Sequence, residues 1–248
     1  MNLAHIINKQ KGVYFTIGII LFLSVFSSCK KKEVSEPSIE TGTVTDVDGN
    51  VYKTVKIGDQ WWMAENLKTT SYQDGSPINL ITKDQDTKWK NDSIGAYTNN
   101  AFLYNGYAIF NPKNIAPEGW HIPSDEEWKE LERNMGMAAD ETDKTSWRGT
   151  NEGEKLMKER DETGLLYWVA YGDVWATNEK GFAALPFGCR FFDGSNGDGV
   201  AKQTGFWWSS TKHGNEIWYR YLDYKNKNIF RYHGPQGYGF SVRCVKNK

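Results

Sequence analysis

The last third of the chain, Gly181 to Val245, constrains the fold most strongly. Short segments rich in Trp, Tyr, Ile, Val and Phe are separated there by clusters of Gly and Asn. Aromatic and β-branched residues favour strands, and Gly and Asn favour turns, so this stretch predicts an antiparallel meander. The whole chain has eleven Trp, thirteen Tyr and twelve Phe. Such rings fill a loop-rich core or form a face that binds sugar or protein, and composition alone does not separate the two.

The end of this stretch reads as a hairpin. Residues 216–224 and 229–233 alternate in polarity and are joined by a turn over 225–228. Alternate residues of a strand point to opposite faces. The side chains expected to point inward, because they are large and apolar, are Trp218, Leu222 and Phe230. Those then expected to point outward are Tyr219, Tyr221, Arg231 and His233.

An exposed row of Tyr with Arg and His suits the recognition of carbohydrate or protein. The ring faces stack on a ligand, and the polar tips form hydrogen bonds at a modest entropic cost. The predicted ligand-binding residues are Trp218, Tyr219, Arg220, Tyr221, Tyr224, Arg231, Tyr232 and His233. The alternative is that all these rings pack in a loop-rich core, since Trp and Tyr are often largely buried.

The N-terminus predicts export. Lys9 and Lys11 precede an apolar run over 13–26, which is followed by two serines and Cys29. This order is typical of a secretory signal peptide, here residues 1–28, and the run is too short to span a bilayer comfortably. The end of the run resembles the lipobox of bacterial lipoproteins, with Phe26 in place of the usual Leu. That resemblance implies acylation of Cys29, and each buried methylene of an acyl chain contributes about 0.8 kcal/mol to membrane binding.

The expected location is therefore the cell envelope, with a lipid anchor in the outer membrane and the leaflet left open. The alternative is a plain signal anchor with an incidental cysteine. Residues 29–40 are charged and poor in apolar side chains, which predicts a flexible tether. Residues 41–248 then form one domain, and the net charge of −1 gives no reason to expect nucleic acid as a partner.

The domain is expected to open with a hairpin around Asp48-Gly49, between strands over 43–45 and 51–57. Asp46, Asp48 and Asn50 have the spacing of a calcium loop. An EF-hand would need a carboxylate where Ile57 stands and helices where strands are expected, so a plain turn is favoured and no metal is predicted. The loop over 193–199 has too few spaced carboxylates to predict a cation site, and cation binding there stays open.

Two helices are predicted. Ser124 can cap the first, with Glu127 as its capping-box partner, and the helix would bury a stripe of Trp128, Leu131 and Met135. The second is expected over 152–160. His121 has no clustered partners in the sequence and is interpreted as a structural hydrogen-bonding residue.

Two cysteines lie within the domain. Export to an oxidising compartment makes Cys189 and Cys244 a candidate disulfide. The alternative is a pair of buried free thiols.

Several motifs carry a family resemblance. In chain order they are residues 48–52, 61–67, 119–124 with 127–128, 177–178 with 181–186, 207–211 and 239–245. They resemble the Fibrobacter succinogenes major paralogous domain family over about residues 41–246. Its members are commonly lipoproteins or secreted proteins, mostly of unknown function.

The helix start at 123–128 and the closing run 239–243 also look like landmarks of the C-type-lectin-like fold. Formylglycine-generating enzymes and the variable proteins of diversity-generating retroelements share that fold. The resemblance implies an α+β domain, with two helices packed on a small twisted antiparallel sheet whose first and last strands meet. In the retroelement-linked relatives, the end of the fold that corresponds to the hairpin over 216–233 carries the ligand face.

The sequence favours binding over catalysis. Copper chemistry like that of the formylglycine-generating enzymes needs two thiols on one segment, whereas Cys189 and Cys244 lie far apart. No Gly-x-Ser-x-Gly, phosphate loop, Cys-x-x-Cys or His-Glu-x-x-His is present, although a chance pair of glycosidase carboxylates is not excluded. We expect a non-catalytic, lipid-anchored adhesion or binding protein for an extracellular glycan or protein, without a cofactor. The alternatives are a surface enzyme, hydrolase or oxidase-like, acting on polysaccharide or protein, and a structural subunit of a surface assembly.

Overall fold

Strands dominate the residues that the computed structural model describes, which are 38–82, 88–89, 96–98, 102–195 and 202–248. The signal peptide, Cys29 and most of the tether lie outside the described residues, as does the end of the 193–199 loop. Ser38–Lys248 forms one compact unit. The described residues form three sheets and three helices, and the mixed α+β character expected from the sequence is confirmed.

The first sheet has the strand order β1-β2-β3-β13-β7. Its strands are β1 (Thr41–Thr45), β2 (Val51–Ile57), β3 (Gln60–Met63), β13 (Val245–Lys246) and β7 (Trp120–His121). The C-terminal strand β13 pairs with both β3 and β7, so the end of the chain closes the sheet that the beginning opens.

The second sheet has the order β8-β11-β10-β9 and carries the predicted hairpin. Its strands are β8 (Ser146–Arg148), β11 (Ile229–Pro235), β10 (Glu216–Asp223) and β9 (Thr204–His213). The third sheet runs β12-β6-β5-β4, with β12 (Gly239–Phe240), β6 (Phe102–Asn105), β5 (Ala96–Thr98) and β4 (Leu80–Thr82). The helices are α2 (Gly106–Ile109), α3 (Asp125–Asn134) and α4 (Glu152–Leu156).

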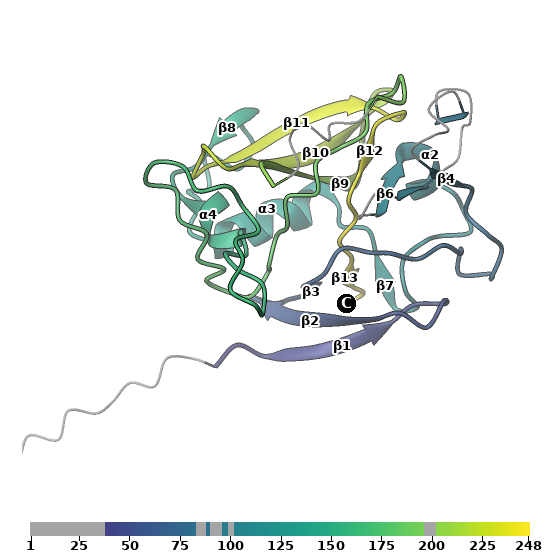
Figure 1. Ribbon diagram of the computed structural model, residues 1–248, viewed down its shortest axis with the longest axis horizontal. Coiled ribbons are helices and arrows are strands. Elements are labelled where there is room, and N and C mark those ends of the chain that lie inside the picture. The colour runs from purple at the N-terminus through teal and green to yellow at the C-terminus, as the bar shows by residue number, and fades with distance from the viewer. Residues whose placement is uncertain (1–37, 83–87, 90–95, 99–101, 196–201) are drawn as a thin grey trace, which may run out of the picture. The chain divides into compact units, whose positions relative to one another are not determined.

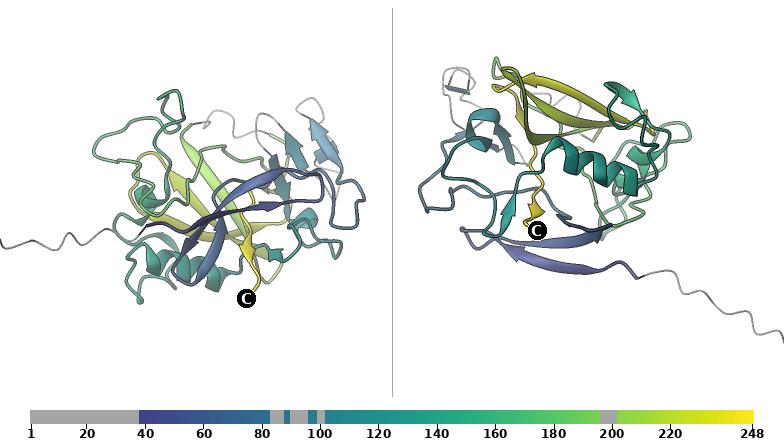
Figure 2. Two further views of the ribbon diagram at one scale, coloured as in Figure 1. Left: turned by 90° about the horizontal axis from the view of Figure 1, so that it is seen from below. Right: turned by 180° about the vertical axis from the view of Figure 1, so that it is seen from behind.

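Helix α3 lies between the first and the second sheet (Figures 1 and 2). One apolar cluster joins the three elements: Val55, Ile57 and Trp62 come from the first sheet, Trp128 and Leu131 from α3, and Trp207, Leu222 and Ile229 from the second sheet. A second cluster, which includes Tyr52, Tyr104, Trp208 and Phe240, lies where α2 and the third sheet meet the other two sheets. The second sheet therefore packs on both of its faces.

The opening hairpin is confirmed, and its turn is held by one carboxylate. Asp46 accepts hydrogen bonds from the backbone N–H of Asp48 and of Asn50, and from the Tyr52 hydroxyl at 2.5 Å. Gly49 takes a positive φ of 83°, which glycine adopts without a Cβ penalty. Asp46 thus organises the turn, whereas the Asp48 carboxylate accepts hydrogen bonds from Thr69 and Thr70.

Helix α3 also begins as predicted. The Ser124 hydroxyl accepts from the Glu127 N–H, and the Glu127 carboxylate accepts from the Ser124 N–H, which completes the capping box. Trp128, Leu131 and Met135 are buried at 1% exposure or less. His121 lies between Glu127 and Asn247, so its structural role is confirmed, and the hydrogen bond to Glu127 raises the pKa of its imidazole.

The second helix is shorter than expected. Residues 152–160 were predicted to be helical, but α4 ends at Leu156. Beyond it the backbone turns to pair with another segment: Ala184 donates to the Leu156 carbonyl, and Lys158 donates to the Ala184 carbonyl. The chain after Leu156 satisfies its polar groups in this pairing, and the extended conformation replaces another helical turn.

The predicted disulfide is wrong. Cys189 and Cys244 are both free thiols, 4% and 0% exposed, in the apolar cluster that contains Trp208 and Phe240. Burial raises the pKa of Cys189 to about 12 and that of Cys244 further. In this position a thiol behaves as a small apolar side chain, and packing explains both residues without a covalent link.

We therefore expect neither thiol to react in the folded protein. In a mature chain carrying Cys29→Ser, iodoacetamide at pH 8 should leave Cys189 and Cys244 unmodified, because the thiolate is the reactive form and both groups are neutral and covered. After unfolding in urea without reductant, mass spectrometry should find two added carbamidomethyl groups. A mass two hydrogens lower, with no addition after unfolding, would show that a disulfide forms.

Candidate ligand-binding face

Strand pairing in the second sheet decides which side chains of the hairpin share a face. Tyr221 lies opposite Phe230. Arg220 lies opposite Arg231. Directly opposed residues of antiparallel strands point to the same side of the sheet. The tyrosine and the phenylalanine therefore share one face, and the two arginines share the other.

The arginine face packs on α3 through buried ion pairs. Asp125 accepts from Nη1 of Arg220 and from Nη2 of Arg231, each at 2.7 Å. Glu132 accepts from Nε of Arg220 at 2.5 Å and from both terminal nitrogens of Arg148 at 2.8 Å. All five side chains are at most 6% exposed.

These pairs exclude two of the predicted ligand-binding residues from the surface. Burial by itself would raise the pKa of Asp125, but hydrogen bonds and charge from Arg231 and Arg220 outweigh it and hold that pKa well below its usual range. Asp125 is thus held as an anion by both guanidinium groups. The prediction that Arg231 points outward is wrong, and Arg220 is buried beside it.

Trp218 and His233 lie at the end of the same face. The Arg231 guanidinium carbon is 3.7 Å from the centre of a Trp218 ring. His233 stacks on His213 with ring centroids 4.2 Å apart, and its Nδ1 contacts the Glu216 carboxylate. Trp218 and His233 are both partly exposed, so they extend the buried network toward the surface. His213 was not predicted, because its place here depends on the register between β9 and β10.

The opposite side of the hairpin carries a continuous set of rings, which we call the aromatic face. Phe206 stacks on Tyr221 with centroids 4.4 Å apart and an interplanar angle of 14°. Phe230 lies 5.7 Å from Tyr221 and 6.4 Å from Tyr219. The members are Phe206, Tyr219, Tyr221, Phe230 and Tyr232. The prediction that Phe230 points away from the tyrosines is therefore wrong.

The aromatic face runs from the core to solvent. At its root Tyr219 packs against Trp208 and Phe240, which are buried. At its outer end Tyr232 is 43% exposed. Tyr238 continues the surface to Phe191 and Phe192, whose ring centroids lie 6.0 and 6.2 Å from it, and Phe192 is 56% exposed. Some of the rings are therefore buried and others are exposed, and the most exposed are those of Tyr232 and Phe192.

Tyr219 and Tyr221 are neutral at physiological pH. Burial raises the pKa of Tyr219 to about 12, and burial together with the neighbouring Asp223 carboxylate raises that of Tyr221 further. Their hydroxyls therefore stay protonated, and the Tyr221 hydroxyl donates to Asp223. Tyr224 lies apart from this face, with its ring 5.4 Å from that of Tyr171.

Over the described residues, no group of three or more His, Cys, Asp or Glu side chains is placed to hold a metal ion. In the same part of the chain no helix is long and apolar enough to cross a membrane.

The most recognisable sequence motifs meet at a structural junction and not at the aromatic face. Arg243 is completely buried, and its guanidinium donates to the carbonyls of Met63, Phe182 and Ala183 and to the side chain of Asn66. Burial lowers the pKa of Arg243 to about 9. Asn66 also accepts from Trp207 Nε1 at 3.0 Å. These hydrogen bonds join four of the sequence motifs, 61–67, 181–186, 207–211 and 239–245. The need to hold these segments together in the fold explains why the motifs contain these residues.

A family model for the Fibrobacter succinogenes major domain matches residues 55–246, which is more than half of the chain. No curated protein matches the chain, and no solved structure does.

The ion pairs under the hairpin predict a large effect of one neutral substitution. Glu132→Gln keeps the size of the side chain but leaves Arg148 and Arg220 without the carboxylate between them. Breaking a buried pair by removing one partner costs about 3–5 kcal/mol. We expect a loss of that size in the free energy of unfolding, measured by urea denaturation of the mature chain.

Glu130→Gln, on the same helix at a partly exposed position, is the matched control and should change stability by no more than about 0.5 kcal/mol. Equal stabilities for the two variants would show that the network does not hold the hairpin on α3.

Proposed function

We propose that this chain, which belongs to the Fibrobacter succinogenes major domain family, is an exported, lipid-anchored protein that binds an extracellular carbohydrate or protein and carries out no catalysis. The observation that carries this proposal is the open end of the aromatic face. Tyr232, Phe191 and Phe192 are 43%, 42% and 56% exposed and continue the rings of the β10–β11 hairpin. Exposed aromatic side chains at the edge of a packed cluster of rings are typical of interaction sites.

The support beneath this face suits a binding role. The arginines on the other side of the same strands are fixed to α3 by Asp125 and Glu132, so the backbone that presents Tyr232 is tied to the core. A surface that is already ordered loses less conformational entropy when a ligand binds. Tyr and Phe add to this advantage, because each ring has only two side-chain torsions to fix.

We also infer that the fold is C-type-lectin-like. The sheet that contains the first strands also contains the last, β13, and α3 packs between that sheet and the hairpin sheet. These features support the C-type-lectin-like assignment, in which the aromatic face lies on the β10–β11 hairpin.

The anchor is inferred from sequence. Cys29 follows a short apolar run and two serines, and charged residues separate it from the domain that begins near Ser38. This order supports a protein held at the outer membrane by acyl chains on Cys29, with its domain beyond a tether.

The aromatic face is tested by a binding screen. Mature protein carrying Cys29→Ser is applied to glycan and extracellular-protein arrays, and each ligand found is titrated against the variant Tyr232→Ala/Phe192→Ala. Loss of two exposed rings at the centre of a site should weaken binding at least about tenfold. Both residues are substantially exposed, so the variant should fold as the parent does.

Tyr107→Ala is the matched control, because Tyr107 is 42% exposed on α2, outside the aromatic face. Its affinity should equal that of the parent. A ligand that binds the double variant and the parent equally well would reject this face as the site.

The anchor predicts a second outcome. Full-length protein made in a bacterium that processes lipoproteins, grown with an alkyne-tagged fatty acid, should take up the label, and Cys29→Ser should abolish it, because no acyl chain can then be attached. Ser35→Ala, in the tether, should be labelled like the parent. A Cys29→Ser protein that still takes up the label would contradict lipidation at this residue.

A further inference from the structure

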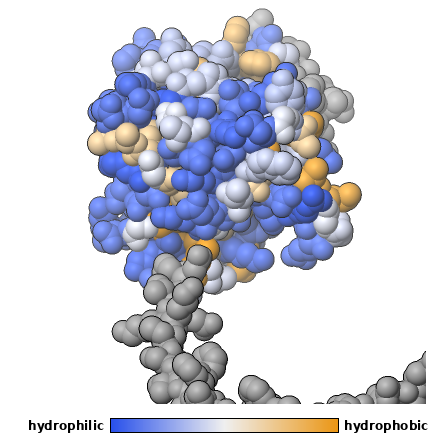
Figure 3. Space-filling view, turned by 90° about the vertical axis from the view of Figure 1, so that its left-hand side faces the viewer, coloured by the Kyte–Doolittle hydropathy of each residue, from blue (hydrophilic) through white to orange (hydrophobic). Residues whose placement is uncertain are grey.

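The loop that follows α4 exposes apolar side chains outside the aromatic face. The large ones between residues 165 and 175 are Leu165, Leu166, Val169, Tyr171 and Trp175, and Trp175 and Leu165 are 67% and 65% exposed. Figure 3 shows the side of the domain on which this loop lies, where the surface is mostly hydrophilic and apolar residues form small separate patches. Apolar side chains gathered on one loop of such a surface need an explanation.

The loop is fixed in place although its side chains are exposed. Trp168 is buried, and its Nε1 donates to the Ala184 carbonyl at 3.1 Å. The Val169 N–H donates to the Lys202 carbonyl at 2.8 Å, and the Trp175 N–H donates to the Glu154 carboxylate at 3.2 Å. Asp173 is paired with Lys227 at 2.8 Å. These bonds tie the loop to α4 and to the β10–β11 turn, so the space that it encloses is already formed.

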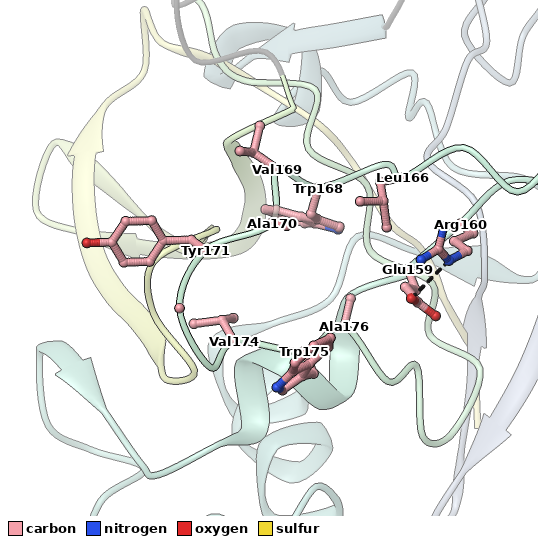
Figure 4. A pocket seen from close by; sticks show the side chains of 11 residues that line it. Glu159, Arg160, Leu166, Trp168, Val169, Ala170, Tyr171, Val174, Trp175 and Ala176 are labelled. Carbon is pink, nitrogen blue, oxygen red and sulfur yellow. Dashed lines mark hydrogen bonds and ion pairs between the residues drawn. The ribbon is translucent and has the colours of Figure 1, made fainter.

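That space is a pocket of about 140 Å³. Figure 4 shows Trp168 and Trp175 on opposite sides of it, with Glu159 and Arg160 together at one end. A cavity of about 150 Å³ in a protein core accepts benzene, so this pocket can hold one apolar ring face, and the hydroxyl groups of a pyranose, which is larger than benzene, would lie outside it at the open rim. Its walls are mainly apolar, from Leu166, Val169, Val174 and Ala176 besides the two indoles.

The rim of the pocket is charged and polar. Nε of Arg160 is 3.0 Å from Oε1 of Glu159, and Nη1 of Arg160 donates to the Gly164 carbonyl. Both side chains are about half exposed. Side by side, a carboxylate and a guanidinium offer an acceptor and several donors to a ligand. An apolar side chain of a partner protein would cover these groups without forming hydrogen bonds to them, at a desolvation cost.

We propose that this pocket is a carbohydrate subsite that takes one pyranose ring of a glycan. A pyranose has apolar C–H faces for the Trp168 and Trp175 walls and hydroxyl groups at its edge for Glu159 and Arg160. The assignment stands independently of the aromatic face, and it places a second contact for a ligand on a different part of the domain.

The test uses fluorine NMR on the mature chain with Cys29→Ser, labelled with 5-fluorotryptophan. The Trp175 resonance is assigned by its loss in Trp175→Phe, and the protein is titrated with cellotetraose, xylotetraose, mannotetraose and N-acetylphenylalanine amide. We expect at least one oligosaccharide to shift the Trp175 resonance saturably, with a Kd of about a millimolar. Binding to the variants is followed by saturation-transfer difference NMR on the oligosaccharide protons, because Trp175→Ala lacks the reporting resonance. Trp175→Ala and Glu159→Gln should each weaken that binding, the former at least about tenfold, while the midpoint of urea unfolding stays that of the parent.

Tyr107→Ala, on α2 and not among the residues that line the pocket, is the control and should leave this binding unchanged. The proposal is overturned if none of the oligosaccharides gives a saturable shift, or if binding survives Trp175→Ala. A saturable shift with N-acetylphenylalanine amide alone overturns it in favour of a protein partner. Oligosaccharide binding lost in Phe192→Ala but kept in Trp175→Ala overturns it while supporting the aromatic face.

Discussion

Two carboxylates on one helix hold the hairpin that the rest of the second sheet is built on. Asp125 and Glu132 are seven residues apart on α3, about two turns, so both side chains lie on the same face of the helix. Between them they form ion pairs with Arg148, Arg220 and Arg231 from three neighbouring strands. Ion pairs of this kind offset a large desolvation cost only when their hydrogen bonds are well placed. The geometry therefore restricts β8, β10 and β11 to one position relative to α3.

Another buried cation, Arg243, does similar work with uncharged partners. Its guanidinium is bound by backbone carbonyls and Asn66, and it lies 4.6 Å from the Phe182 ring. It connects the closing segment to the loop before β9 and to the segment after β3. The most recognisable residues of the chain thus specify how distant segments meet, and the surfaces available to a ligand are formed by other residues.

Local signals in the sequence were sufficient for the parts of the fold that depend on nearby residues. The Ser124 cap, the Trp128 stripe and the Asp-Gly hairpin each follow from residues within a few positions of one another. The faces of the closing hairpin could not be read in that way. Apolar bulk placed Phe230 inward and Arg231 outward, but the carboxylate that pairs with Arg231, that of Asp125, lies on a helix about a hundred residues earlier.

The register of the hairpin carried a usable signal that polarity obscured. A four-residue turn over 225–228 would set Asp223 opposite Phe230, and the observed partner is Tyr221, two residues earlier. Either register puts the phenylalanine on the same face as the tyrosines. The pocket between Trp168 and Trp175 could not be predicted from the sequence, because it depends on where Trp168 is anchored and on a loop with no regular periodicity. The predicted length of α4 was wrong for a related reason. The helix ends where the backbone pairs with Ala184, which is distant in the sequence.

The separation of the hairpin into two chemically different faces affects how the protein can evolve. Tyr232 and its neighbour Arg231 are adjacent in the chain, yet one contributes to a partly open surface and the other to a buried charge network. Replacing a ring at the open end leaves every ion pair beneath it intact. Descendants of this chain can therefore diversify the chemistry they display while inheriting the same scaffold, because mutational tolerance and mutational constraint alternate residue by residue along a single strand.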